Sequence, residues 1–117
     1  MAKLTVEMAD TPAALAHGLM YRKNMPENEG MLFKFPSIRE ANFWGKNTYI
    51  PLDIAFIDKD NRIMEIKQIV PMSTRVVRSE GLCAMALETN AGYFGSNGIS
   101  VGHIIDIDNN TIEFKEC

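Results

Sequence analysis

The chain has 117 residues, 46% hydrophobic and 23% charged, with 15 acidic and 12 basic side chains and a formal charge of −3. This length accommodates a single domain, residues 1–117, and the composition is typical of a soluble globular protein. The charges are interspersed, and the best basic cluster is only Lys67, Arg75 and Arg78, which argues against a nucleic-acid partner.

The N-terminal segment alternates apolar and polar residues, so residues 4–8 are predicted to form a strand. The segment turns acidic at Glu7 and therefore lacks the apolar core of a secretory signal. No run approaches the ~20 apolar residues of a membrane span. We therefore expect a cytoplasmic location and no membrane span, while export of a longer precursor stays open.

A helix start follows. The hydroxyl of Thr11 can cap a helix, and Pro12 suits the first helical position because its missing N–H would be unpaired there. Leu15, Leu19 and Arg22 follow at helical spacing. We therefore expect a helix over residues 12–22 that presents these three side chains on one face.

The rest of the chain has strand-like patterns. Strands are predicted over residues 30–36, 42–48, 53–57, 62–70, 82–88, 104–107 and 111–114. Turn-forming residues join them into hairpins at residues 58–61 and 108–110, where Asp and Asn tolerate left-handed backbone. Residues 90–95 could form one helical turn capped by Asn90. We expect a mainly β, α+β fold, a small compact barrel or sandwich with one N-terminal helix.

Cys83 and Cys117 are the only cysteines. Cys83 sits in an apolar run, where a free thiol behaves as a small hydrophobe. Cys117 is terminal, and a terminal residue rarely holds the fixed geometry of a disulfide. Two free thiols are therefore expected, with a single bridge between them as the alternative.

Common catalytic and metal-binding patterns are absent from the sequence. It has no His-x-His, no Cys-x-x-Cys, no Gly-x-Ser-x-Gly and no phosphate-binding glycine loop. His17 and His103 are interpreted as surface or strand-edge residues. The acidic turn at residues 58–61 lacks the glycine and distal glutamate of a calcium loop. We expect no metal and no cofactor.

The most distinctive stretch, residues 43–53, combines the only tryptophan with a lysine, an amide, a hydroxyl and a carboxylate. In a strand, Trp44, Lys46 and Thr48 would face the same way. Such a platform suits stacking on a ring or sugar with hydrogen bonds to its edge. The structural alternative is equally open, because Asn-Thr ahead of Pro-Leu-Asp is also good turn chemistry.

These motifs, taken in order, resemble the domain of unknown function 192 family. The matching residues are Gly18-Leu19-Met20 with Arg22, Gly30-Met31-Leu32-Phe33 with Phe35, Phe43-Trp44 with Lys46-Asn47-Thr48, Pro51-Leu52-Asp53, Leu87-Glu88, Gly92 and Gly102. The resemblance covers residues 4–114 and implies a small β-rich fold but no reaction.

Two positions depart from the family pattern. Gly45 stands where the family usually has methionine, which predicts a void, a neighbouring methionine that fills it, or a strand bulge. His103 stands where the family tends to have aspartate, so a ligand or base at that position is lost or replaced by a group that titrates near neutrality.

Three function hypotheses remain. The leading one is a non-catalytic ligand-binding or accessory domain that takes a small anionic or sugar-like ligand, or a peptide segment. Its cleft would be lined by Arg22, Trp44, Lys46, Asn47, Thr48, Asp53 and Glu88. The first alternative is a small enzyme with Asp53 or Glu88 as general acid or base, and Lys46 and Arg22 stabilising negative charge. The second is a partner-binding module without a pocket.

Two structural observations would separate these hypotheses. A strongly raised pKa at Asp53 or Glu88 beside an open pocket favours the enzyme, whereas a flat apolar patch favours the partner-binding module. We also expect Arg22 to pair with Asp53 or Glu88 at the seam between helix and sheet, because a half-buried arginine needs a counter-charge.

Overall fold

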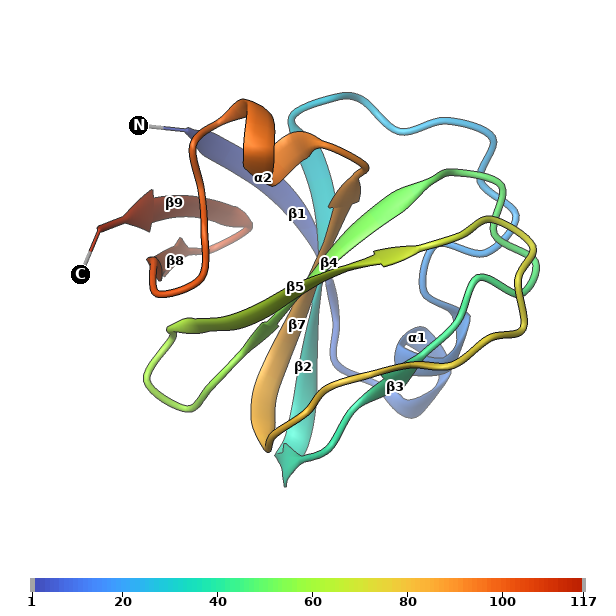
Figure 1. The fold of residues 1–117 in the computed structure, drawn as a ribbon, viewed down its shortest axis with the longest axis horizontal. Helices are drawn as coiled ribbons and strands as arrows, with labels where there is room; N and C mark the ends of the chain where they lie inside the picture. Colours follow the sequence, from blue (N-terminus) through green and yellow to red (C-terminus); the bar gives the residue numbers. More distant parts are fainter. Residues whose placement is uncertain (1, 117) are drawn as a thin grey trace.

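A computed structural model describes residues 2–116 as a twisted sheet flanked by two short helices (Figure 1). The elements are β1 (Lys3–Ala9), α1 (Pro12–His17), β2 (Glu29–Arg39), β3 (Asn42–Phe43), β4 (Leu52–Ile57), β5 (Ile63–Ile69), β6 (Val77–Arg78), β7 (Cys83–Asn90), α2 (Tyr93–Ser96), β8 (Ile104–Asp108) and β9 (Thr111–Lys115). The expected mainly β, α+β fold is confirmed, including a short helix near residues 90–95.

Seven strands form one sheet in the order β5-β4-β7-β2-β1-β9-β8, in which β1 and β2 run parallel and the other neighbours antiparallel. The sheet curls into a half-barrel, and its two edge strands, β5 and β8, approach each other where each of them begins. Arg62 bridges Ile104, and the Ile63 N–H donates to the His103 carbonyl at 2.9 Å. The predicted hairpins β4–β5 and β8–β9 are both present.

Each face of the sheet carries its own buried core, because successive side chains of a strand point to opposite faces. Leu87 of β7 packs with Phe94 of α2 and Phe114 of β9 on one face. The neighbouring Ala86 packs with Phe33 of β2 and Leu19 on the other. The second face also carries the small β3–β6 sheet, and the candidate site lies there.

Helix α1 is shorter than predicted. Thr11 caps it as expected, since its Oγ1 accepts from the Ala14 N–H at 3.2 Å. The helix ends at Gly18, whose φ of +52° is a conformation that side chains rarely adopt. A Cβ at Gly18 would also lie 3.3 Å from the Phe33 ring. The glycine therefore ends the helix and lets the chain turn across β2, and Arg22 does not continue the helical face.

The strand predicted over residues 42–48 is wrong beyond Phe43. Strand β3 pairs with β6 for two residues, and the chain then turns at Lys46 and Asn47. Asn47 has φ +57°, which fits this turn. Trp44, Lys46 and Thr48 therefore do not share one strand face.

The cap predicted for the second helix is also wrong. Gly92, with φ +88°, stands at the N-cap of α2. The Asn90 side chain instead donates to the carbonyls of Met25 and Pro26, at 2.9 and 3.2 Å. Asn90 therefore ties the end of β7 to the loop that precedes β2.

Cys83 is a free thiol buried on β7, and burial raises its pKa. Cys117 lies outside the described residues. No helix among residues 2–116 has the length and apolar composition needed to cross a membrane.

Candidate functional site

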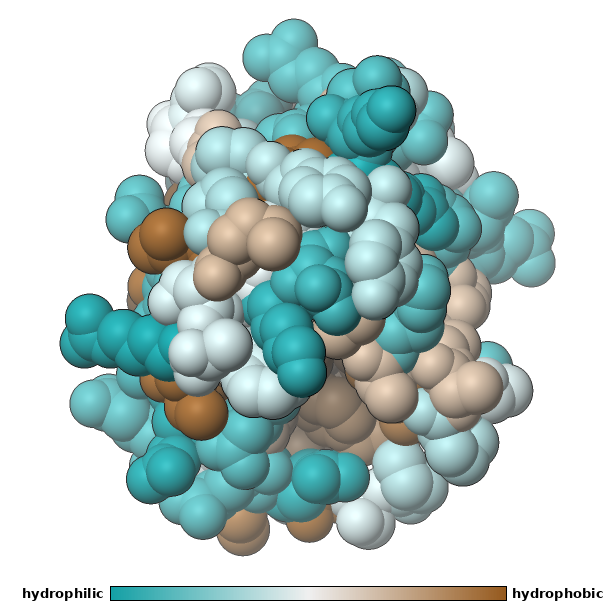
Figure 2. Space-filling view, turned by 90° about the vertical axis from the view of Figure 1, so that its right-hand side faces the viewer, coloured by the Kyte–Doolittle hydropathy of each residue, from teal (hydrophilic) through white to brown (hydrophobic). Residues whose placement is uncertain are grey.

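A cleft of about 600 Å³ opens on the second face of the sheet, between α1, the end of β2 and residues 41–48. It is lined by Pro12, Leu15, Ala16, His17, Gly18, Leu19, Met20, Phe33, Phe35, Pro36, Arg39, Ala41, Asn42, Phe43, Trp44, Thr48 and Glu88. Figure 2 views this side of the molecule and shows a hollow with hydrophobic residues at its floor and on its right, and hydrophilic residues above and below it. A concave, mainly apolar lining with few polar groups is typical of small-molecule sites.

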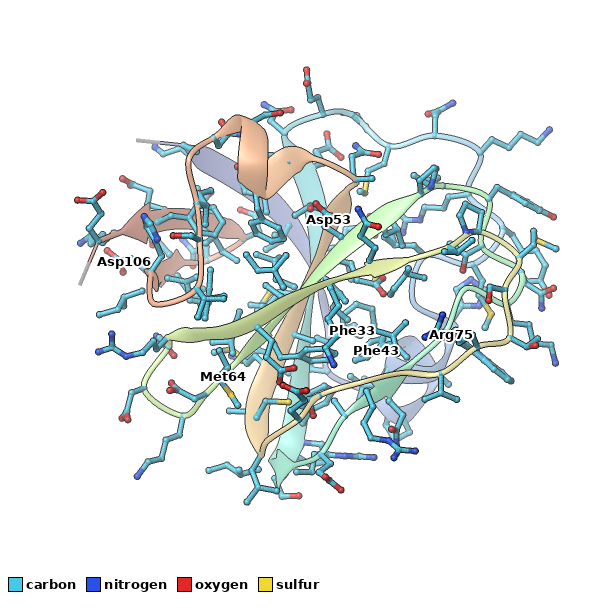
Figure 3. All side chains as sticks on the ribbon, viewed as in Figure 1. Phe33, Phe43, Asp53, Met64, Arg75 and Asp106 are labelled. Atoms are coloured by element: carbon cyan, nitrogen blue, oxygen red, sulfur yellow. The ribbon has the colours of Figure 1, made fainter. Side chains whose placement is uncertain are left out.

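Aromatic rings form the walls of the cleft. Phe33 of β2 and Phe43 of β3 meet edge to face, with ring centroids 5.0 Å apart, and lie next to each other in Figure 3. Phe35 packs on Phe43 at 6.3 Å. Such contacts hold the rings in fixed orientations. The walls are therefore preformed.

Glu88 is the one acidic side chain in the lining. On the sheet it lies opposite Met31 of β2 and Ile54 of β4, so both flanking side chains are apolar. Its residue surface is 4% exposed. Burial raises the pKa of this carboxyl to about 8, since among residues 2–116 no charge or hydrogen bond offsets it. At pH 7 the group is therefore mostly protonated.

Two cations sit on aromatic rings of the lining. The Lys46 Nζ lies 5.2 Å from the centroid of the Trp44 ring, and the Arg39 guanidinium carbon lies 5.7 Å from that of Phe35. Trp44 and Arg39 are exposed to solvent. These contacts are therefore cation–π pairs at the mouth of the cleft, where each contributes about 0.5–1 kcal/mol.

The loop that carries Trp44 is anchored by its backbone. The Tyr21 N–H donates to the Asn47 carbonyl at 2.8 Å, and the Thr48 Oγ1 donates to the Lys46 carbonyl at 3.2 Å. Thr48 is buried and lines the cleft, whereas Asn47 does not. Asn47 therefore serves turn geometry, as the structural alternative proposed.

Gly45 fits this loop for a reason that the sequence did not reveal. A Cβ there would lie 1.9 Å from the Val70 carbonyl oxygen. The Gly45 N–H also donates to the Ser73 carbonyl at 2.9 Å. None of the three predicted outcomes at Gly45 occurs, because the backbone of the 70–73 segment occupies the space.

The expected pairing of Arg22 with Asp53 or Glu88 is wrong. The Arg22 guanidinium forms a two-pronged ion pair with the Glu7 carboxylate of β1, and its Nη2 lies 2.8 Å from Oε1. This hydrogen bonding lowers the pKa of Glu7 and raises that of Arg22. Arg22 does not line the cleft.

Asp53 serves the opposite face of the sheet. It pairs in register with Thr89, whereas its neighbour Ile54 pairs with Glu88, so the two acidic side chains point to different faces. The Asp53 Oδ2 accepts from the Gly92 N–H at 2.8 Å, at the start of α2 (Figure 3). Asp53 is therefore a backbone anchor that does not line the cleft.

Of the seven predicted site residues, the cleft brings together Trp44, Thr48 and Glu88. The structure adds His17 and Arg39, together with the Phe33–Phe35–Phe43 wall. The alternation of Phe33 and Phe35 along β2 already places both rings on one face. That pattern is also the ordinary pattern of a core, so the sequence alone does not mark the wall as a site.

A family model for DUF192, described as "Uncharacterized ACR", matches residues 1–107. The chain belongs to the domain of unknown function 192 family. The resemblance noted in the sequence is thereby confirmed. A search of the curated proteins found no significant match.

Two crystal structures resemble this DUF192 member closely. One is from Sinorhizobium meliloti 1021 and is provisionally described as a transcription regulator; it is 39% identical, with a TM-score of 0.83, over 95% of this chain and 81% of that chain. The other is a protein of unknown function from Novosphingobium aromaticivorans DSM 12444, 37% identical, with a TM-score of 0.84, over 87% of this chain and 74% of that chain.

Proposed function

We propose that this protein is a non-catalytic ligand-binding domain whose site is the cleft beside residues 41–48. The observation that carries the proposal is a buried acidic group, Glu88, at the lining of an open cleft with aromatic walls. A buried carboxyl between apolar neighbours destabilises the folded state. Its presence in the cleft therefore suggests a role other than stability. A ligand that hydrogen-bonds this carboxyl supplies such a role.

The charged groups that line the cleft limit the chemical class of its ligand. Arg22 and Lys46, which suggested an anionic ligand, lie outside the lining. The lining holds the acidic Glu88, which is buried, and the basic Arg39, which is exposed at the mouth. A ring-bearing or sugar-like molecule, or an apolar side chain of a peptide segment, suits the walls better than an anion. Its polar end would meet the Glu88 carboxyl.

A fragment screen by thermal shift and NMR tests this proposal, since a bound ligand stabilises the folded state by mass action. Trp44→Ala is the test variant, because Trp44 lines the cleft and is 42% exposed, so its loss should disturb folding little. Tyr49→Ala is the matched control, since Tyr49 is 46% exposed and outside the lining. We expect about tenfold weaker binding in Trp44→Ala alone. Equal binding by both variants would contradict the site.

A small enzyme is the second candidate, and one observation favours it. The pKa of Glu88 is raised to about 8 beside the cleft, which suits a general acid or base near neutral pH. Against this, Arg22 and Lys46 do not line the cleft to stabilise developing charge. Conversion of a screened compound by the wild type but not by Glu88→Gln, followed by NMR over time, would favour the enzyme.

The description of the Sinorhizobium relative suggests a role in the control of transcription. The net charge of −3 and the lack of a basic stripe in the sequence favour ligand binding over direct binding to DNA. We also propose a single domain in the cytoplasm, since a free buried thiol such as Cys83 suits a reducing compartment.

A further inference from the structure

We propose that the cleft binds an ammonium group, with the Glu88 carboxylate as its counter-charge and the aromatic walls as its cage. This inference rests on the proposed function and names the ligand class of the same site. The ammonium group can belong to a free amine or to a lysine side chain of a peptide, and both carry the same chemistry.

The walls suit a positive charge. Ring faces attract cations, and the attraction strengthens where water is displaced. Two rings of the lining already hold cations of the protein itself, Lys46 over Trp44 and Arg39 over Phe35. Phe33 and Phe43 lie deeper and make no such contact within residues 2–116. Phe33 is 1% exposed, so Phe43, which is half-buried, is the inner ring open to an ammonium group of a ligand.

Glu88 distinguishes a cation from other ligands. An anion would disfavour ionisation of the buried carboxyl further. A neutral ligand would pack on the rings and accept or donate one hydrogen bond, but would lack the attraction that ring faces exert on a positive charge. An ammonium group uses both the carboxylate and the rings. Its charge also compensates the ionised form of Glu88, which burial otherwise disfavours.

The other titratable or charged residues that line the cleft are exposed to solvent, unlike Glu88. The titratable or charged lining residues besides Glu88 are His17, at the end of α1, and Arg39, at the end of β2. Strands β4 and β7 add no other charge to the lining. Residues 41–48 carry the exposed Lys46, whose Nζ lies over the Trp44 ring at the mouth of the cleft. His17 and Arg39 are both exposed, so solvent screens their repulsion of an entering cation.

Binding should release a proton. At pH 7 the Glu88 carboxyl is mostly protonated, and an ammonium ligand binds its ionised form, so the carboxyl O–H bond breaks and one proton leaves to solvent. For a quaternary ammonium, which does not titrate, affinity should rise about tenfold per pH unit below the Glu88 pKa of about 8 and level off above it.

Calorimetry with choline and its neutral isostere 3,3-dimethylbutan-1-ol tests the inference at pH 6, 7 and 8. We expect choline to bind more tightly than the alcohol at pH 8. Choline affinity should then fall about fivefold from pH 8 to pH 7 and about tenfold more from pH 7 to pH 6, as the ionised fraction of Glu88 falls. In Glu88→Gln the pH dependence should vanish, and choline affinity at pH 8 should be at least tenfold below that of the wild type. Asp53→Asn, which changes the other buried carboxyl outside the lining, should bind choline as the wild type does.

A peptide arm separates the two sources of the ammonium group. The tripeptides Gly-Lys-Gly and Gly-norleucine-Gly, both acetylated at the N-terminus, differ only in the side-chain ammonium group. Tighter binding of the lysine peptide than of choline assigns the site to peptides, and the reverse assigns it to free amines; either result supports the inference. Equal binding of choline and the alcohol, unchanged in Glu88→Gln, overturns it while leaving the cleft a ligand site. If the fragment screen also finds no ligand, the proposed function fails as well.

Discussion

Glu88 of β7 lies directly opposite Met31 of β2, so a carboxyl group faces a thioether in the middle of the sheet. Both residues are buried. Ionising the carboxyl there removes a charge from water without a compensating partner among residues 2–116. Because Glu88 is buried opposite Met31, the protonation state of its carboxyl affects the stability of the folded protein.

The first prediction concerns stability against pH. The folded pKa of Glu88, about 8, lies above the usual 4.5, so between these values the folded state holds a proton that the unfolded state has released. The free energy of unfolding should therefore fall as pH rises from 5 to 8, by up to about 1.4 kcal/mol per pH unit. Urea unfolding of wild type and Glu88→Gln measures it. The Gln variant should lose this slope, and parallel curves would contradict the assignment.

The second prediction concerns the Arg22–Glu7 ion pair. Arg22 lowers the pKa of Glu7, so the pair stabilises the fold above the ordinary pKa of a glutamate and is lost as pH falls through the lowered value. Both side chains are partly exposed, so a double-mutant cycle with alanine should give a coupling of about 0.5–1 kcal/mol at pH 7. Ligand affinity in the cleft should not change. A coupling of zero would show that the pair does not form in solution.

The third prediction contrasts two glycines. Gly45→Ala places a methyl group against the Val70 carbonyl oxygen, whereas Gly95→Ala meets nothing within 4 Å. We expect Gly45→Ala to lose at least about 2 kcal/mol of stability, because the 44–48 and 70–73 segments must separate. Gly95→Ala should change stability by less than about 1 kcal/mol. Thermal unfolding of both variants, compared with wild type, decides whether the close approach exists.

The fourth prediction assigns Asp53 to the fold. Asp53→Ala removes the acceptor of the Gly92 N–H and should cost about 1–3 kcal/mol. Asp106→Ala is the control. Asp106 is exposed and pairs with the exposed Lys115 at 3.0 Å, where solvent screens the pair, so its loss should change stability far less than Asp53→Ala does. Neither variant should alter ligand affinity. If Asp53→Ala remains folded but no longer binds the ligand, Asp53 is part of the binding site and the prediction is wrong.

The hairpins were predictable because their turns are local. Residues 58–61 and 108–110 combine aspartate and asparagine, and Asn61 and Asn109 take the positive φ angles that such turns require. The cap at Thr11 was predictable for the same reason. In each case the deciding contacts lie within a few residues of one another in the sequence.

The errors come from long-range contacts. Gly18, with φ +52°, ends α1 where Phe33 of β2 leaves little room for a side chain. The Val70 carbonyl likewise leaves no room for a side chain at Gly45, two residues after β3 ends. Arg22 then meets Glu7, fifteen residues earlier, instead of an acidic residue of the later strands. Glu88 was named as a site residue from its motif, but its apolar neighbours Met31 and Ile54 follow only from strand register.

The most direct test of the account is an NMR titration of the Glu88 carboxyl carbon, assigned by comparison with Glu88→Gln. The account predicts a midpoint near pH 8 in the free protein, and a midpoint at least one unit lower when choline saturates the cleft. A midpoint near 4.5 in the free protein would mean that water reaches the carboxyl freely. That result would contradict a buried recognition group in the cleft.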